Sequence, residues 1–220
     1  MPIARSTLTG VVSGVVLLAG VAGFGIGLPK ATGDDGPTAS LPTLPDRLDQ
    51  RMVAVAALTP EDAGATDPND KQLIEQFVTA ADKGDADASK KFDELYGGGT
   101  VRLYIDGSVL ATQGQQRPAQ MSVSIVPGEA GLVIPNGPFP ISQGGSRYEL
   151  QEIDGHRCGV SWQEPTDPTT GQPTGGEVPA SNYEAECRAQ RDGLAYDVYA
   201  SGLSPEEVAG YLDKVLELTA

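Results

Sequence analysis

The feature that most constrains this chain is a long uncharged run at its N-terminus. Residues 6–29 contain no charged side chain, and residues 11–28 are almost entirely apolar. A helix needs about 20 apolar residues to cross a bilayer. We therefore expect a transmembrane anchor over residues 6–28. The single Arg5 before the run, with acidic residues soon after it, favours a cytoplasmic segment 1–5 and a C-terminal domain outside the cytoplasm.

The same run has a second interpretation, as a secretory signal. Such a signal has a basic start and a shorter apolar core of about 7–15 residues, followed by a cleavage site between small residues. This run is longer, and Arg5 is the one basic residue before it. We expect a retained anchor or uncleaved signal. The alternative is cleavage near Ala31-Thr32-Gly33, just after Pro29 ends the apolar helix.

Small residues recur at a spacing of four within the run. This spacing allows two membrane helices to approach closely. It indicates either a membrane-protein partner or self-association, and the competing explanation is that short apolar helices are often rich in glycine. The candidate docking face consists of Gly10, Gly14, Ala19, Gly23 and Gly27.

The remainder of the chain is strongly acidic. After residue 29 it carries all thirty acidic residues and fourteen of the fifteen lysines and arginines, a formal charge of −16. Such a surface repels phosphate backbones, so we expect no nucleic-acid partner. Residues 29–45 are rich in proline and glycine and are expected to form a linker. Residues 46–220 are expected to form one acidic extracytoplasmic domain.

Helices are predicted on both sides of the strand-forming region. Asp67-Pro68 is typical of a helix start, and Gly84 is expected to end that helix. A second short helix is expected from Asp85 to the glycines at 97–99. Ser204-Pro205-Glu206-Glu207 has the pattern of a capping box and predicts a C-terminal helix that covers the sheet.

From Thr100 onward the apolar residues alternate, which is typical of strands. Asp106-Gly107 predicts a two-residue hairpin that sets Leu103 opposite Leu110. At Asp154-Gly155 we expect a three-residue loop, with Gly155 left-handed and Leu150 facing Cys158.

The two cysteines give the sharpest prediction. If Cys158 faces Cys187 in an antiparallel pair, a turn at Asp192-Gly193 sets Cys187 opposite Val198 on the same face. In a domain outside the cytoplasm, two such cysteines indicate one structural disulfide. The expected fold class is α+β, with an antiparallel β-meander sheet of five to eight strands covered by N- and C-terminal helices.

No residues have the pattern of a catalytic or cofactor-binding site. His156 is the single histidine, and no serine or cysteine has a recognisable nucleophile context, so we assign no catalytic residue, cofactor or metal. A calcium loop starting at Asp85 would need Gly at 90 and Glu at 96, which are Lys and Tyr here. The aspartates of this region are therefore interpreted as helix caps and solvated charge: Asp82, Asp85 and Asp87, with Ser89 beside them.

We therefore expect a single-pass membrane-anchored binding or accessory protein of a bacterial-type cell envelope, without catalytic activity of its own. One alternative is a cleaved, secreted protein that binds a small apolar or lipidic ligand between sheet and helix. Another is a carboxylate-dependent wall hydrolase built around Glu184 and Glu186, which the alternation places on the outer face as solvated residues. Residues 164–180 are either a recognition loop or a tolerated insertion.

Overall fold

The computed structural model describes residues 40–111, 117–131, 133 and 135–220. The expected anchor, its candidate docking face (Gly10, Gly14, Ala19, Gly23 and Gly27) and most of the linker lie outside these residues. Among the helices that are described, none combines the length and the apolar character that crossing a membrane requires.

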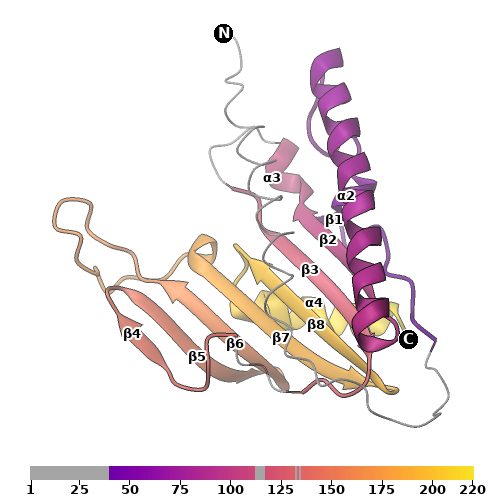
Figure 1. Cartoon of the computed structure of the whole chain (residues 1–220). Coiled ribbons are helices and arrows are strands. Elements are labelled where there is room, and N and C mark those ends of the chain that lie inside the picture. The colour runs from indigo at the N-terminus through magenta and orange to yellow at the C-terminus, as the bar shows by residue number, and fades with distance from the viewer. Residues whose placement is uncertain (1–39, 112–116, 132, 134) are drawn as a thin grey trace.

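The centre of the domain is one antiparallel sheet of eight strands, in the order β1-β2-β3-β8-β7-β6-β5-β4 (Figure 1). The α+β class and the antiparallel sheet are confirmed, but the sheet is more than a simple meander, because β3 pairs with the last strand. The strands are β1 (Met52–Ala54), β2 (Thr100–Asp106), β3 (Gln120–Pro127), β4 (Ile141–Gln143), β5 (Ser146–Ile153), β6 (His156–Gln163), β7 (Tyr183–Arg191) and β8 (Leu194–Ser201).

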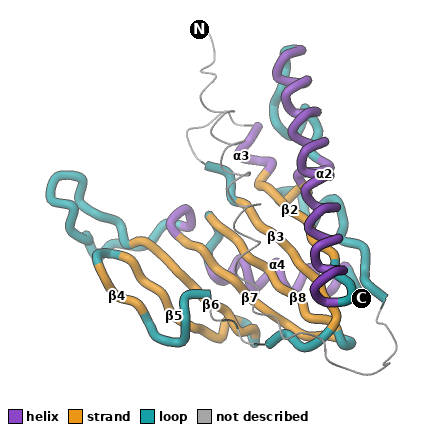
Figure 2. The backbone as a smooth tube through the Cα atoms, viewed as in Figure 1, coloured by secondary structure: helices purple, strands orange, loops and turns teal. Residues whose placement is uncertain are grey.

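Two helices cover opposite faces of the sheet (Figures 1 and 2). On one side, α4 (Pro205–Leu218) packs mainly on β7 and β8, and its Ser204 capping box is formed. We call this side the α4 face. On the other side, α2 (Pro68–Tyr96) packs on β2 and on the short helix η1 (Val55–Ala57). We call this side the α2 face. The main core fills the α4 face and includes Met121, Val123, Val160, Val198, Leu203, Val208, Leu212 and Val215.

The disulfide and the register around it are confirmed. Cys158 pairs directly with Cys187 and is bonded to it, and both residues are buried in the core on the α4 face. Cys187 also faces Val198, and the turn at Asp192-Gly193 has positive φ at both residues, as a two-residue hairpin requires.

The prediction of two separate N-terminal helices was wrong. Asp67 caps the start as expected, accepting from the backbone N–H groups of Asn69 and Asp70, but the helix then continues through Gly84 to Tyr96. A glycine inside a helix costs only about 1 kcal/mol. Apolar side chains on both sides of Gly84, Phe77 before it and Phe92 after it, pack against the rest of the domain and outweigh that cost.

The hairpin predicted at Asp106-Gly107 was also wrong. A carboxylate oxygen of Asp106 accepts hydrogen bonds from the N–H and hydroxyl groups of Ser108, which starts the short helix α3 (Gly107–Ala111) instead. The other oxygen of Asp106 is bonded to Arg51. With this aspartate used as a helix cap, β2 pairs with β3 through a longer connection.

The turn at Asp154-Gly155 is tighter than expected. Both residues have positive φ, and Ile153 pairs directly with His156, so the loop has two residues rather than three. Gly155 is left-handed as predicted. The shorter loop moves the register by one residue, and Leu150 therefore faces Gly159 instead of Cys158 and stays 44% exposed.

Gly84 and Gly97 provide a matched test of the continuous helix. Gly84→Ala should raise the free energy of unfolding by about 0.5–1 kcal/mol, because an added Cβ meets nothing within 4 Å and alanine favours the helix. Gly97→Ala should lower it by about 1 kcal/mol, because φ is +75° at this helix end. Urea unfolding of the full chain measures both. A loss of stability in Gly84→Ala would contradict a helix that runs through residue 84.

The disulfide should contribute substantially to stability. Replacing both Cys158 and Cys187 with alanine should lower the free energy of unfolding by about 3–4 kcal/mol, because the bridge closes a loop across 29 residues of sequence. Chemical unfolding of the oxidised chain and of the double variant gives this difference. Equal unfolding midpoints would show that the bridge does not constrain the unfolded chain.

Candidate functional site

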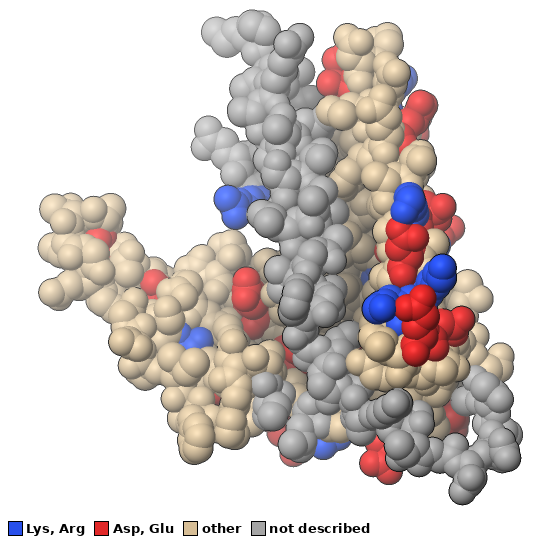
Figure 3. Space-filling view, in the orientation of Figure 1, with Lys and Arg blue, Asp and Glu red and all other residues tan. Residues whose placement is uncertain are grey.

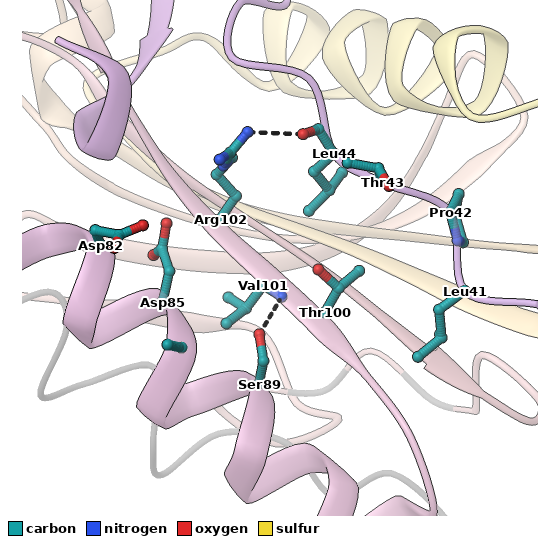
Figure 4. Close-up of a pocket in the computed structure, with 11 residues that line it drawn as sticks. Leu41, Pro42, Thr43, Leu44, Asp82, Asp85, Ser89, Thr100, Val101 and Arg102 are labelled. Atoms are coloured by element: carbon teal, nitrogen blue, oxygen red, sulfur yellow. Dashed lines mark hydrogen bonds between the residues drawn. The ribbon is translucent and has the colours of Figure 1, made fainter.

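A cleft opens where α2, β2 and the start of the domain meet (Figure 4). Its volume is about 370 Å³, within the range of small-molecule sites. One wall is the segment 41–46, which includes the end of the expected linker; we call it the strap because Arg102 and Tyr104 of β2 are hydrogen-bonded to it. The other wall is α2, and β2 forms the floor. The lining residues that matter below are Leu41, Asp82, Asp85, Ser89, Val101 and Arg102.

The floor of the cleft is the part of β2 that β1 leaves uncovered. β1 pairs only with residues 104–106, so on the edge of β2 away from β3 the N–H groups of Val101 and Leu103 have no described strand beside them. The hydroxyl of Ser89 accepts from Val101 at 3.3 Å, and the carboxylate of Asp85 accepts from Leu103. Asp85 and Ser89, one turn apart on α2, therefore accept the hydrogen bonds of two backbone N–H groups at this edge of β2. Without them, this edge would be free to pair with another strand.

Arg102 holds the strap in place. Its guanidinium donates to the carbonyl oxygen of Leu44 and to the carboxylate of Asp46, both at 2.7 Å. The hydroxyl of Tyr104 adds a hydrogen bond to the carbonyl of Pro45. The positive charge of Arg102 is thus engaged by the strap, and Figure 4 shows its side chain directed toward Leu44.

Asp85 is the unusual group of the cleft. Burial raises its pKa to about 6, Asp82 contributes in the same direction, and Arg102 with the Leu103 N–H act against the rise. Oxygen Oδ2 of Asp85 is enclosed and has no hydrogen-bond partner within the described residues. The carboxylates of Asp82 and Asp85 lie next to each other at the side of the cleft (Figure 4).

The structure corrects the interpretation of these aspartates as caps and solvated charge. Asp82, Asp85 and Ser89 all line the cleft, whereas Asp87 faces solvent and pairs with Lys83. Their spacing of three and four residues would have placed them on one helix face, but the expected break at Gly84 concealed that pattern. Across the part of the chain that is described, no three His, Cys, Asp or Glu residues are grouped so as to hold a metal ion.

The expectation for the outer carboxylates was wrong in part. Glu184 is exposed as predicted, but Glu186 is only 7% exposed and is bonded to Arg188, which also pairs with Asp197 across the sheet. Arg188 faces Asp197 on the neighbouring strand, and both residues are buried. These side chains lie on the α2 face, and one guanidinium serves two carboxylates.

The pKa of Glu186 is shifted, because Glu186 and Asp197 lie close together and share the single guanidinium of Arg188. Burial, together with the negative charge of Asp197 and against the opposing effect of Arg188, raises the pKa of Glu186 to about 8. Glu186 therefore holds its proton to a higher pH than an exposed glutamate does. Two close carboxyl groups that hold one proton between them resemble an acid–base pair, but here both are bonded to Arg188.

The remaining singled-out residues have structural contacts. Nε2 of His156 lies 2.8 Å from a carboxylate oxygen of Asp213, which ties the β5–β6 turn to α4. Residues 164–180 form an arm, where Asp167 accepts from the N–H groups of Thr169 and Thr170. Acidic and basic side chains gather along α2 on the face in Figure 3, whereas this arm is mostly uncharged.

Comparison of the chain with protein families, curated proteins and solved structures finds no match. Any assignment of function therefore depends on the residues and geometry described above.

Glu186 gives a test of the buried cluster through pH. The pKa of Glu186 is about 8 in the folded protein, whereas that of an unfolded glutamate is about 4.3. Between these pH values the folded chain holds a proton that the unfolded chain has lost, so the free energy of unfolding falls as pH rises. Glu186→Gln removes this loss and should become steadily more stable relative to the native chain from pH 5 to pH 8.

Thermal unfolding across this pH range measures the difference between the two chains. Glu184→Gln, on the exposed neighbour, is the control and should change the profile far less. A constant difference between Glu186→Gln and the native chain at every pH would refute the raised pKa.

Proposed function

We propose that this chain is a membrane-anchored protein whose acidic domain lies outside the cytoplasm and acts by binding, as an accessory subunit without catalytic activity of its own. The observation that carries the proposal is the closed Cys158–Cys187 bridge in the domain core. Disulfides persist in oxidising compartments and are rare in the cytosol. The apolar run at residues 6–28 supplies the means of export and anchoring.

The position of the cleft supports a binding role close to the membrane. The strap that forms one wall includes the last residues of the proline-rich linker, and Arg102 and Tyr104 hold it against the sheet. A ligand or partner in the cleft would therefore contact the same segment through which the anchor is attached.

The two alternatives receive less support from the packing. The space between sheet and α4, where an apolar ligand was envisaged, is filled by fully buried side chains such as Val208 and Leu212. The carboxylate pair needed for a hydrolase would have to involve Glu186, which is bonded to Arg188. A cleaved, secreted form remains the competing account of the N-terminal run.

Fractionation and thiol labelling of cells that make the full chain test this proposal. We expect the chain at its full mass of 22.8 kDa in washed membranes, because the apolar run remains attached. Both cysteines should resist a maleimide reagent in denaturant until a reductant is added. A smaller soluble product would favour the secreted alternative, and thiols that react without reductant would contradict a location outside the cytoplasm.

A further inference from the structure

We infer that the outer edge of β5, at Leu150 and Glu152, binds an extended basic segment of a partner protein, which adds to the sheet as a further antiparallel strand. This inference names a class of partner for the proposed binding role and rests on that role. It depends on which backbone groups of β5 are left open and on the side chains beside them.

The pairing of β5 fixes which of its backbone groups point outward. The two-residue turn makes Ile153 and His156 a hydrogen-bonded pair. The N–H of Glu164 donates to the carbonyl of Gly145, which fits the same alternation at the other end of β5. The odd-numbered residues of β5 therefore bond to β6, and the even-numbered residues point toward the outer edge. β4 pairs with only the first part of this edge, up to Tyr148.

The outward backbone groups of Leu150 and Glu152 are therefore left open. Before β4 the chain bends at Pro138 and Phe139 and does not continue along β5. Within the described part of the chain, nothing forms a hydrogen bond to these outward groups. At the other end of the sheet, side chains of α2 cap the open edge of β2, but α2 lies far from β5 (Figure 1). A row of free backbone donors and acceptors is complemented by an extended polypeptide.

Exposed apolar side chains lie beside the open edge. Ile141 and Leu150 are 40% and 44% exposed. They lie on the same face of the sheet, because Ile141 is opposite Tyr148 and Leu150 follows two residues later. A large apolar side chain on the added strand, opposite Leu150, would lie between these two residues and bury part of both.

The charges at the edge select the sign of the partner. Glu149 and Glu152 are exposed, and so is Asp154 in the turn that follows. The single cation directly opposite them on β6 is Arg157, which faces Glu152. A second copy of this acidic chain would bring like charges together at the edge, whereas a lysine or arginine opposite Glu152 would form a cross-strand pair of opposite charge. In an antiparallel strand, this basic residue comes two positions before the apolar one.

Amide hydrogen exchange and amide shifts test the inference on the full chain in zwitterionic detergent micelles. The probe is the peptide acetyl-Thr-Val-Lys-Thr-Leu-Gly-amide. In the free chain, the amides of Leu150 and Glu152 should exchange rapidly with solvent, whereas the amide of Gln151, which donates to β6, should be protected. Added peptide should shift both open amides until they saturate, and should slow their exchange several-fold.

Two methylated peptides test the strand pairing itself. The leucine of the probe, opposite Leu150, would exchange two backbone hydrogen bonds with it, whereas the N–H of the threonine opposite Gln151 would point away from β5. N-methylation of this leucine should therefore weaken binding about tenfold. N-methylation of the threonine between lysine and leucine is the matched control and should weaken binding far less.

Charge variants complete the test. A probe with glutamate in place of lysine should not saturate. Glu152→Gln should weaken binding of the lysine peptide about two- to fivefold. Glu75→Gln removes the same charge from an exposed position of α2 and should bind as the native chain does.

Four results would overturn the inference: no saturable shift at Leu150 and Glu152, unchanged binding after methylation of the leucine, equal binding of the glutamate peptide, or slow exchange of both amides in the free chain. Slow exchange that is lost on dilution would show that a second copy occupies the edge instead. None of these outcomes alters the membrane and thiol measurements, so the two proposals can fail separately.

Discussion

The register between β6 and β7 is the constraint on which the rest of the domain depends. Because Cys158 faces Cys187, every second side chain of these strands, counted from the cysteines, lies on the α4 face. A shift of the pairing by one residue in either strand would move that strand's side chains to the opposite face of the sheet. The turn at Asp192-Gly193 extends the same order to β8, which joins β3. The core beneath α4 and the buried charges on the opposite face both follow from this one alignment.

The other end of the sheet is stabilised differently. β1 is only three residues long, and the remaining edge of β2 is covered by side chains of α2 and by the strap. This arrangement protects the edge without another strand. It also creates a cleft in which most polar groups are bonded within the fold, while Oδ2 of Asp85 has no hydrogen-bond partner among the described residues.

Much of the fold was predictable because its determinants are local. The Asp67 and Ser204 caps, the alternation along β6 to β8 and the cysteine pairing each depend on residues close in sequence or on one shared register. The failures occurred where tertiary contacts outweighed local preference. Packing on both sides of Gly84 kept α2 continuous, and the bond to Arg51 helped make Asp106 a helix cap rather than a turn residue.

The candidate site was harder to predict than the fold. The sequence drew attention to Asp82 and Asp85 as possible calcium ligands. Their position beside a cleft, however, depends on β2 and the strap, which lie far away from them in sequence. Likewise, the alternation placed Glu186 on the outer face without revealing that this part of the face is buried. Burial of a polar side chain depends on what covers it, and a single strand pattern does not contain that information.

The most direct test of this account is the titration of the Asp85 carboxyl group itself, followed by carbon-detected NMR of the free full chain. The account predicts a midpoint near pH 6, with the Leu103 amide shifting at the same midpoint because it donates to that carboxylate. A midpoint near pH 3.9, the value of an ordinary exposed aspartate, would contradict the enclosure of the Asp85 carboxylate beside the cleft.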